Sequence, residues 1–132
     1  MNRHDERETV FCLLFEYKFN NTLTPDEIME LASELRDFAP TPYIEDTFRQ
    51  AITKFDELDS LISEYAKGWK ITRFSATTST ILRLAMFEIL YNGDVPESVA
   101  INEAVELAKR YDTDEAPAFI NGILGSYSRR QQ

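Results

Sequence analysis

The fold of this chain is decided by one segment, Ile81–Leu124, which reads ILRLAMFEILYNGDVPESVAINEAVELAKRYDTDEAPAFINGIL. Apolar residues occupy almost every face of its first helical stretch, and Asn92-Gly93 is the expected end of that helix. Two further segments with helical spacing follow, AINEAVELAKRY and AFINGIL. A helix that is apolar all round must be buried on several sides. The segment therefore predicts a central helix with other helices packed around it.

The same helical period recurs upstream of this segment. Thr24-Pro25-Asp26-Glu27 supplies a hydroxyl N-cap, a proline in the first turn and a glutamate three residues after the cap. The stripe predicted to face inward from that helix is Ile28, Leu31, Ala32, Leu35 and Phe38. The first helix is expected over about residues 5–18, and the third is expected to begin at residue 42. The fourth is expected across 58–65, with Gly68 as its end. The last three are expected over about 78–92, 98–111 and 115–127. The prediction is an all-α bundle of about seven helices, with no strand-like alternation.

The overall composition fits a single acidic domain. The 132 residues carry a net charge of −9, and a domain of this length can bury roughly two-thirds of its unfolded surface. Residues 1–72 contribute −7 of this charge and residues 73–132 contribute −2. RNA-binding domains usually present a basic face, because phosphate contacts release counterions. The charge alone therefore argues against nucleic acid, although a local basic patch in the second half stays open.

Candidate chemistry is sparse, so we expect no enzyme, no cofactor and no metal site. The one histidine, His4, lies at the N-terminus, and the one cysteine, Cys12, lies in the apolar run VFCLLF, where we expect a buried thiol in a reduced cytoplasm. The acids of Asp56-Glu57-x-Asp59 are expected in the first turn of a helix rather than at a metal. No run of 18 uncharged apolar residues exists, and the charged N-terminus argues against export. The expected location is the cytoplasm.

Four motifs occur in one order along the chain: WKITRF at 69–74, LRLAMFE at 82–88, VAINEAVELAK at 99–109 and FINGIL at 119–124. In this order and spacing they resemble the NusB family of bacterial transcription antitermination factors. The resemblance implies one domain over 1–132, made of two helical subdomains at about 1–72 and 73–132 that share the central fifth helix. Arg83 and Glu88 on that helix are expected to find partners elsewhere, since an unpaired buried charge is costly.

The resemblance also implies a function. NusB-like proteins bind a short single-stranded RNA element, boxA, jointly with the small ribosomal protein NusE, and act on RNA polymerase during transcription of ribosomal RNA. By position, the implied RNA contacts are Arg3, His4, Arg7, Lys109, Glu115 and Phe119. The implied NusE contacts are Phe15 and Thr78.

The chain departs from the family pattern at two places. Acids stand between the N-terminal arginines, in Arg3-His4-Asp5-Glu6-Arg7-Glu8, and Thr78 occupies a position where the family usually has an acid. Lys67, Lys70 and Arg73 form either a compensating basic ridge or an ordinary solvated helix end.

Other interpretations of single residues stay open at this point. Phe119 belongs either to the core, with Ile120, Ile123 and Leu124, or to a surface that stacks a base. Gly122 is expected to admit the close approach of another helix, since a glycine inside a helix costs about 1 kcal/mol relative to alanine.

Two alternative functions remain beside the RNA-binding adaptor. One is a protein-interaction scaffold with little RNA binding, which the acidic charge would suit. The other is the NusB-like RNA-binding domain of an rRNA cytosine methyltransferase. A homodimer is also compatible with the sequence.

Overall fold

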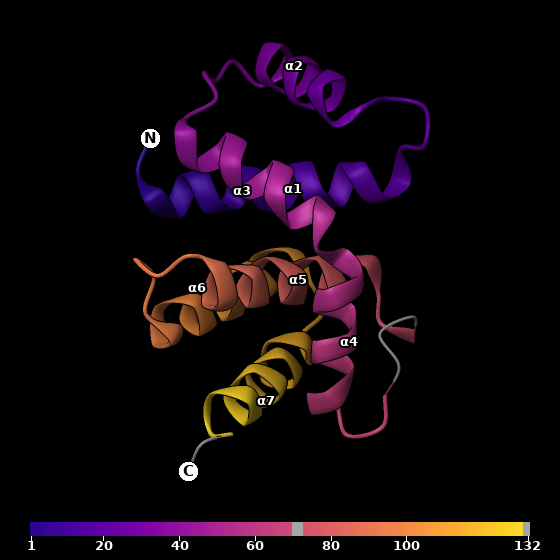
Figure 1. Cartoon of the computed structure of the whole chain (residues 1–132), viewed down its shortest axis with the longest axis vertical. Coiled ribbons are helices and arrows are strands. Elements are labelled where there is room, and N and C mark those ends of the chain that lie inside the picture. Colours follow the sequence, from indigo (N-terminus) through magenta and orange to yellow (C-terminus); the bar gives the residue numbers. More distant parts are fainter. Residues whose placement is uncertain (70–72, 131–132) are drawn as a thin grey trace. The chain divides into compact units, whose positions relative to one another are not determined.

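The computed structural model describes residues 1–69 and 73–130. Within those residues the seven helices are α1 (Arg3–Phe19), α2 (Pro25–Leu35), α3 (Pro42–Thr53), α4 (Phe55–Tyr65), α5 (Ala76–Tyr91), α6 (Glu97–Tyr111) and α7 (Ala116–Ser128), labelled in Figure 1. The predicted all-α fold of about seven helices is confirmed. The fourth helix ends at Tyr65, before Gly68, which adopts a positive φ of 89° two residues after the helix C-cap.

The chain forms two compact units, Met1–Thr53 and Lys54–Gln132, called unit 1 and unit 2 below. The division falls at Thr53–Lys54 and not near residue 72, the position expected from the sequence. The physical reason is that α4 packs against α5 and α7 and so belongs to the second unit.

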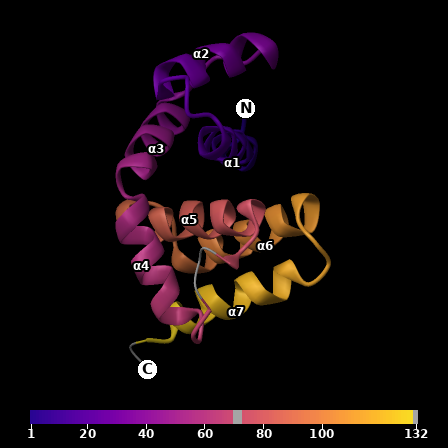
Figure 2. The same cartoon turned by 90° about the vertical axis from the view of Figure 1, so that its right-hand side faces the viewer.

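In unit 1, α1 is the central element, because α2 and α3 both pack against it. Figure 2 looks nearly along the axis of α1 and shows these two helices beside it. Val10 and Leu14 of α1 and Ile44 and Phe48 of α3 are buried. The predicted capping box starts α2: Thr24 accepts a hydrogen bond from the Glu27 amide, and the Glu27 carboxylate accepts one from the Thr24 amide.

The predicted inward stripe of α2 is only partly right. Ile28 and Ala32 are buried, whereas Leu31 and Leu35 are exposed and Phe38 lies beyond the helix. The buried side of α2 is centred on Ile28, Met29 and Ala32, so the edge of the stripe that carries the two leucines stays in solvent. Amphipathic spacing marks an apolar face but not how much of it a neighbour covers.

The expectation of a buried Cys12 is also wrong, because its side chain is half-buried. Cys12 lies on the opposite side of α1 from Val10 and Leu14, which face the core.

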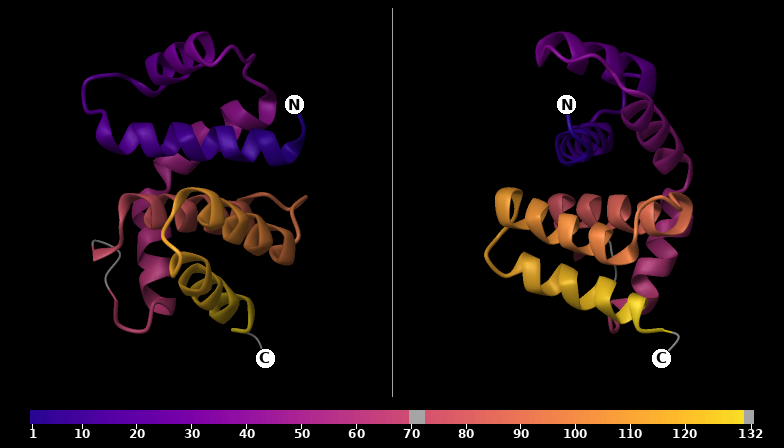
Figure 3. Two further views of the ribbon diagram at one scale, coloured as in Figure 1. Left: turned by 180° about the vertical axis from the view of Figure 1, so that it is seen from behind. Right: turned by 90° about the vertical axis from the view of Figure 1, so that its left-hand side faces the viewer.

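In unit 2, α5 contacts each of α4, α6 and α7 (Figure 3). It is buried on nearly every face, which confirms the central position of this helix within the unit. Arg83 of α5 finds a partner on α4, as expected: its Nε and Nη2 donate to the two carboxylate oxygens of Asp59 at 2.7 and 2.8 Å. The guanidinium also lies 4.5 Å from the ring centroid of Phe55.

The acids near the start of α4 lie in the helix as predicted, and two of them also reach α5. Asp56 and Glu57 are in the first turn, and Asp59 holds Arg83. The hydroxyl of Tyr91 donates a hydrogen bond to Glu57, and this bond raises the pKa of Tyr91 above its ordinary value.

Gly122 of α7 does not admit a neighbouring helix, contrary to expectation. The residue is exposed, and a methyl group at its Cβ position would meet nothing within 4 Å. Among the helices that the structure describes, none combines the length and apolar character that crossing a bilayer requires.

Candidate functional site

A hollow of about 550 Å³ opens in unit 2 where the segment before α5 meets the loop between α6 and α7. Its walls are Trp69, Arg73, Phe74, Ser75, Thr78, Asp112, Thr113, Glu115, Ala116 and Phe119. The volume lies within the range of about 300–1,000 Å³ that is usual for small-ligand sites. Two carboxylates, one guanidinium and three aromatic rings therefore surround one concave surface.

Hydrogen bonds join two helix ends at this hollow, the start of α5 and the end of α6. Ser75 caps the N-terminus of α5 by accepting from the Thr78 amide at 3.1 Å. The Thr78 hydroxyl donates to Oδ2 of Asp112, the C-cap residue of α6, at 2.5 Å. Oδ1 of Asp112 accepts from the Thr113 amide at 2.8 Å. Asp112 thus places a carboxylate beside Thr78, where the chain lacks the acid that the resemblance implies.

Phe119 lies at the edge of the core rather than wholly inside or outside it. Its ring is half-buried and meets the ring of Phe74 edge-to-face, with centroids 5.1 Å apart and an interplanar angle of 88°. Ile120 and Leu124, on the same helix, are fully buried. The apolar stripe of α7 therefore serves the core, while Phe119 lines the hollow.

Trp69 lines this site but was not among the ligand contacts expected from the sequence, whereas Arg73 was one of the three cations of the possible basic ridge. The Trp69 side chain is 58% exposed, and Arg73 is exposed as well. Both also line a second hollow of about 420 Å³, together with Lys67 and Gly68. Of the three cations proposed as a basic ridge, Lys67 and Arg73 thus share one hollow, and Lys70 lies outside the described residues. The signal that could have identified this region is the tryptophan of the WKITRF motif.

Glu115 and Lys109 hold different positions in unit 2. Glu115 lines the hollow as the residue that precedes α7, is exposed, and makes no side-chain capping hydrogen bond to that helix. Lys109 lies on the exposed side of α6, where its ammonium is 3.4 Å from the Glu106 carboxylate, and it is not part of the hollow. The structure therefore brings Thr78, Glu115 and Phe119 together but not Lys109.

The N-terminal candidates open α1 in unit 1, and they differ in exposure. Arg3 and His4 are exposed, whereas Arg7 is only 4% exposed. The guanidinium of Arg3 lies 4.1 Å from the ring centroid of Tyr43, and that of Arg7 lies 6.0 Å from it. Arg3 and His4 are the two of these three that present their side chains to solvent.

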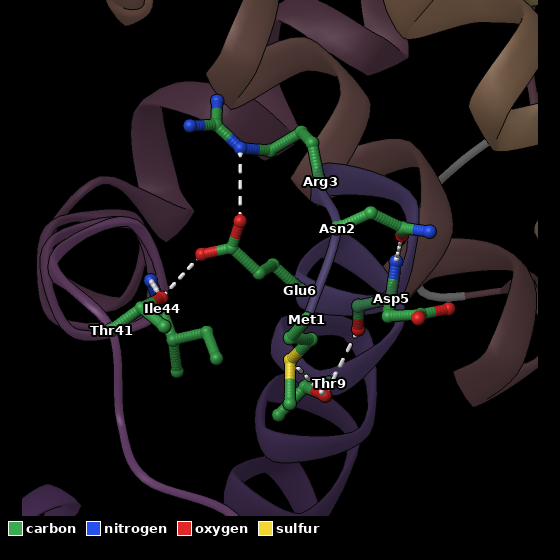
Figure 4. A network of polar contacts seen from close by, with 8 residues as sticks. All are labelled: Met1, Asn2, Arg3, Asp5, Glu6, Thr9, Thr41 and Ile44. Atoms are coloured by element: carbon green, nitrogen blue, oxygen red, sulfur yellow. Dashed lines mark hydrogen bonds and ion pairs between the residues drawn. The ribbon is translucent and has the colours of Figure 1, made fainter.

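Glu6 ties this segment to the start of α3 (Figure 4). One carboxylate oxygen of Glu6 lies 3.4 Å from Nε of Arg3, and the other accepts a hydrogen bond from the Thr41 hydroxyl. Glu6 is 9% exposed, so this acid is part of the packing between α1 and α3. Asp5, in contrast, is exposed in the first turn of α1.

Phe15, the implied partner contact of unit 1, lies in a groove of about 370 Å³ between α1 and α2. The exposed side chains of Phe19, Leu31 and Leu35 line the same groove. The uncovered part of the α2 stripe therefore forms a wall of this groove.

These surfaces carry groups that suit recognition of a ligand. Aromatic rings with free surface accept stacked bases, and nearby guanidinium or ammonium groups attract phosphates. Among the described residues, no group of three His, Cys, Asp or Glu side chains is placed to hold a metal ion.

Comparisons with known proteins agree along the whole chain. The model of the NusB family matches residues 4–129. The chain is 41% identical to the transcription antitermination protein NusB of Agathobacter rectalis, over 97% of this chain and 100% of the relative. It is 39% identical to the protein of the same name from Alkaliphilus oremlandii, over 99% and 96%.

Solved structures give the same result. A structure of T. maritima NusB has a TM-score of 0.82 at 34% identity and covers 95% of this chain and 89% of its own. A crystal structure of the antitermination factors NusB and NusE in complex with dsRNA has a TM-score of 0.82, covers 97% and 98%, and at 23% identity shows the fold alone. With a family match over nearly its full length and relatives near 40% identity, the chain belongs to the NusB family.

Proposed function

We propose that this chain is a transcription antitermination factor that binds boxA-type single-stranded RNA jointly with NusE. It acts without catalysis, on RNA polymerase that transcribes ribosomal RNA in the cytoplasm. Membership of the NusB family carries this proposal. The partly exposed aromatic rings and adjacent cations of unit 2 support it, because stacking and phosphate attraction are the usual means of holding single-stranded RNA.

The proposed contacts divide into three groups. Arg3, His4 and Arg7 face RNA from the start of α1, with Arg7 depending on a rearrangement because its side chain is buried. Glu115 and Phe119 contact RNA at the hollow of unit 2, and Lys109 contributes from α6. Phe15 and Thr78 contribute to NusE binding. The name of the related complex, which contains NusB, NusE and RNA, supports the choice of partners.

Two alternatives are weaker. The relatives from Agathobacter and Alkaliphilus are named antitermination proteins and align over 100% and 96% of their length, which favours an antitermination factor over a methyltransferase domain. A scaffold without RNA binding remains the alternative that the net charge of −9 favours. An experiment on RNA affinity separates it from the proposal.

The first prediction is that tight RNA binding requires NusE. Arg3 is the one N-terminal arginine that is well exposed, so the chain alone neutralises few phosphates. The slope of log affinity against log salt should be about one to two for the isolated chain. Fluorescence anisotropy of labelled boxA RNA, with the chain alone and with NusE from the same organism, measures both quantities. The adaptor proposal fails if the mixture with NusE binds no more tightly than either protein alone, and a slope above about four would reveal a further basic surface.

The second prediction concerns the acids between the N-terminal arginines. Asp5→Arg changes the local charge by two units at an exposed position, so RNA affinity at low salt should rise several-fold and the salt slope should steepen. The helix should lose about 0.3–1 kcal/mol, the value of a first-turn carboxylate.

Glu6→Arg is the informative comparison, because it makes the same charge change at a buried residue that bonds Arg3 and Thr41. This variant should lose clearly more stability in thermal unfolding than Asp5→Arg. If Asp5→Arg leaves RNA affinity unchanged, the start of α1 does not face RNA, and the scaffold becomes the better proposal.

A further inference from the structure

Trp69 lines two hollows of unit 2 that differ in their charged walls. The walls of the first hollow include the carboxylates of Asp112 and Glu115 and the ring of Phe119. The charged walls of the second hollow are Lys67 and Arg73. Arg73 lines both hollows, as Trp69 does. The aromatic wall of the first hollow suits a planar group, and the cations of the second hollow suit an anionic group. A nucleotide combines both groups.

The two carboxylates of the first hollow are not equivalent. Both oxygens of Asp112 already accept hydrogen bonds, from Thr78 and from the Thr113 amide. Glu115 is exposed and makes no capping bond to α7, so its oxygens are available to a ligand. A carboxylate accepts hydrogen bonds and cannot donate them. On its Watson–Crick edge, guanine presents two adjacent hydrogen-bond donors, N1–H and the N2 amino group. Each of the other bases presents donors from only one atom of its Watson–Crick edge.

We propose that the hollow lined by Trp69 and Phe119 is a guanine-binding pocket for single-stranded RNA. The base stacks on the Trp69 indole, and the Glu115 carboxylate accepts from N1–H and N2–H. The Arg73 guanidinium contacts an adjoining phosphate, with Lys67 beside it. This inference rests on the proposed RNA-binding function and assigns to that function a base preference and two further contact residues.

The chain carries its own reporter for this proposal, because Trp69 is its only tryptophan. A base stacked on the indole quenches its fluorescence. Titration of the full chain at low salt with a short uridine oligomer that holds one central guanosine should therefore quench Trp69 with the same midpoint as the anisotropy of the labelled oligomer.

Base selectivity tests the role of Glu115. Replacing the central guanosine by inosine removes only the N2 amino group, and replacing it by adenosine removes the paired donors. Both changes should weaken binding to the unmodified chain several-fold. The inosine penalty should vanish in Glu115→Ala, since the acceptor is gone. An inosine penalty of equal size in both proteins would overturn the assignment of Glu115.

Substitutions of Trp69 and Arg73 test stacking and charge separately. Trp69→Leu should weaken RNA binding by about 5- to 150-fold, the range expected for one stacked base, while Trp69→Phe keeps most of the affinity. Arg73→Gln should lower the salt slope by about 0.7, as expected for one phosphate contact. Lys18→Gln, an exposed lysine of unit 1, is the matched control and should leave the slope unchanged. Melting temperatures of all variants exclude an effect through folding.

The possible failures are distinguishable. If labelled RNA binds but Trp69 is not quenched and Trp69→Leu binds equally well, the pocket proposal is overturned and the RNA-binding function stands. If the chain binds no RNA, either alone or with NusE, the proposed function fails, and this inference fails as well.

Discussion

Replacing Phe119 with alanine is expected to weaken RNA binding by about 1–3 kcal/mol, or roughly 5- to 150-fold, because one aromatic stacking surface is lost. The structure makes this loss separable from unfolding. Phe119 is half-buried and its ring contact is to Phe74 at the edge of the hollow, while Ile120 and Leu124 fill the core. Stability should therefore fall by less than the roughly 3–5 kcal/mol of a buried phenylalanine. Urea unfolding and anisotropy of the same samples give the two numbers.

Phe119→Leu is the control for this experiment, since leucine keeps apolar volume against Phe74 but has no aromatic face. It should unfold near the unmodified midpoint and still bind RNA weakly. Phe74→Ala removes the other ring of the pair and should affect stability more than affinity. If Phe119→Ala loses several kcal/mol of stability and binds RNA normally once corrected for the unfolded fraction, Phe119 is a core residue.

Asp59→Ala should destabilise unit 2 by about 3 kcal/mol, at the lower end of the cost of breaking a buried ion pair. Its carboxylate takes two hydrogen bonds from Arg83, whose side chain is 11% exposed, so the variant leaves a poorly solvated guanidinium without its acceptor. The lower end applies because Asp59 itself is 23% exposed, and water can replace part of the lost interaction. Chemical denaturation gives the free energy of unfolding.

A double-mutant cycle tests whether the pair itself causes the loss. Arg83→Leu combined with Asp59→Leu removes both charges, and the double variant should be more stable than the sum of the single losses predicts. Asp56→Ala, an exposed first-turn acid of the same helix, should cost only about 0.3–1 kcal/mol. A loss for Asp59→Ala no larger than that for Asp56→Ala would show that the pair contributes little.

The sequence by itself determined the features that depend on neighbours along the chain. The Thr24–Glu27 capping box forms as predicted, because both partners lie within one helical turn. The burial of α5 on nearly every face was predictable as well, since a helix without a polar face has no other stable environment in water. The motifs from residue 69 onward likewise indicated the family.

Only the tertiary structure decided which surfaces meet. Arg83 was expected to have a partner, but Asp59 became that partner because α4 packs on α5. Leu31 and Leu35 continue the apolar stripe of α2 yet remain exposed, because the neighbouring helix covers only part of that stripe. Helical spacing states which residues share a face, whereas the depth of packing on that face depends on residues far away in sequence.

The candidate site shows most clearly the difference between what the local sequence predicts and what helix packing decides. The motifs marked Trp69 and Phe119 as family positions, but these residues are fifty positions apart, and nothing in their local sequence indicates a common hollow. The hollow exists because Asp112, at the end of α6, accepts the hydroxyl hydrogen bond of Thr78 in the first turn of α5. That contact sets the α6–α7 loop against the segment before α5. Local hydrogen bonds and apolar spacing can be predicted from the sequence, because their residues are close along the chain. A concave surface between distant segments forms only when the helices pack.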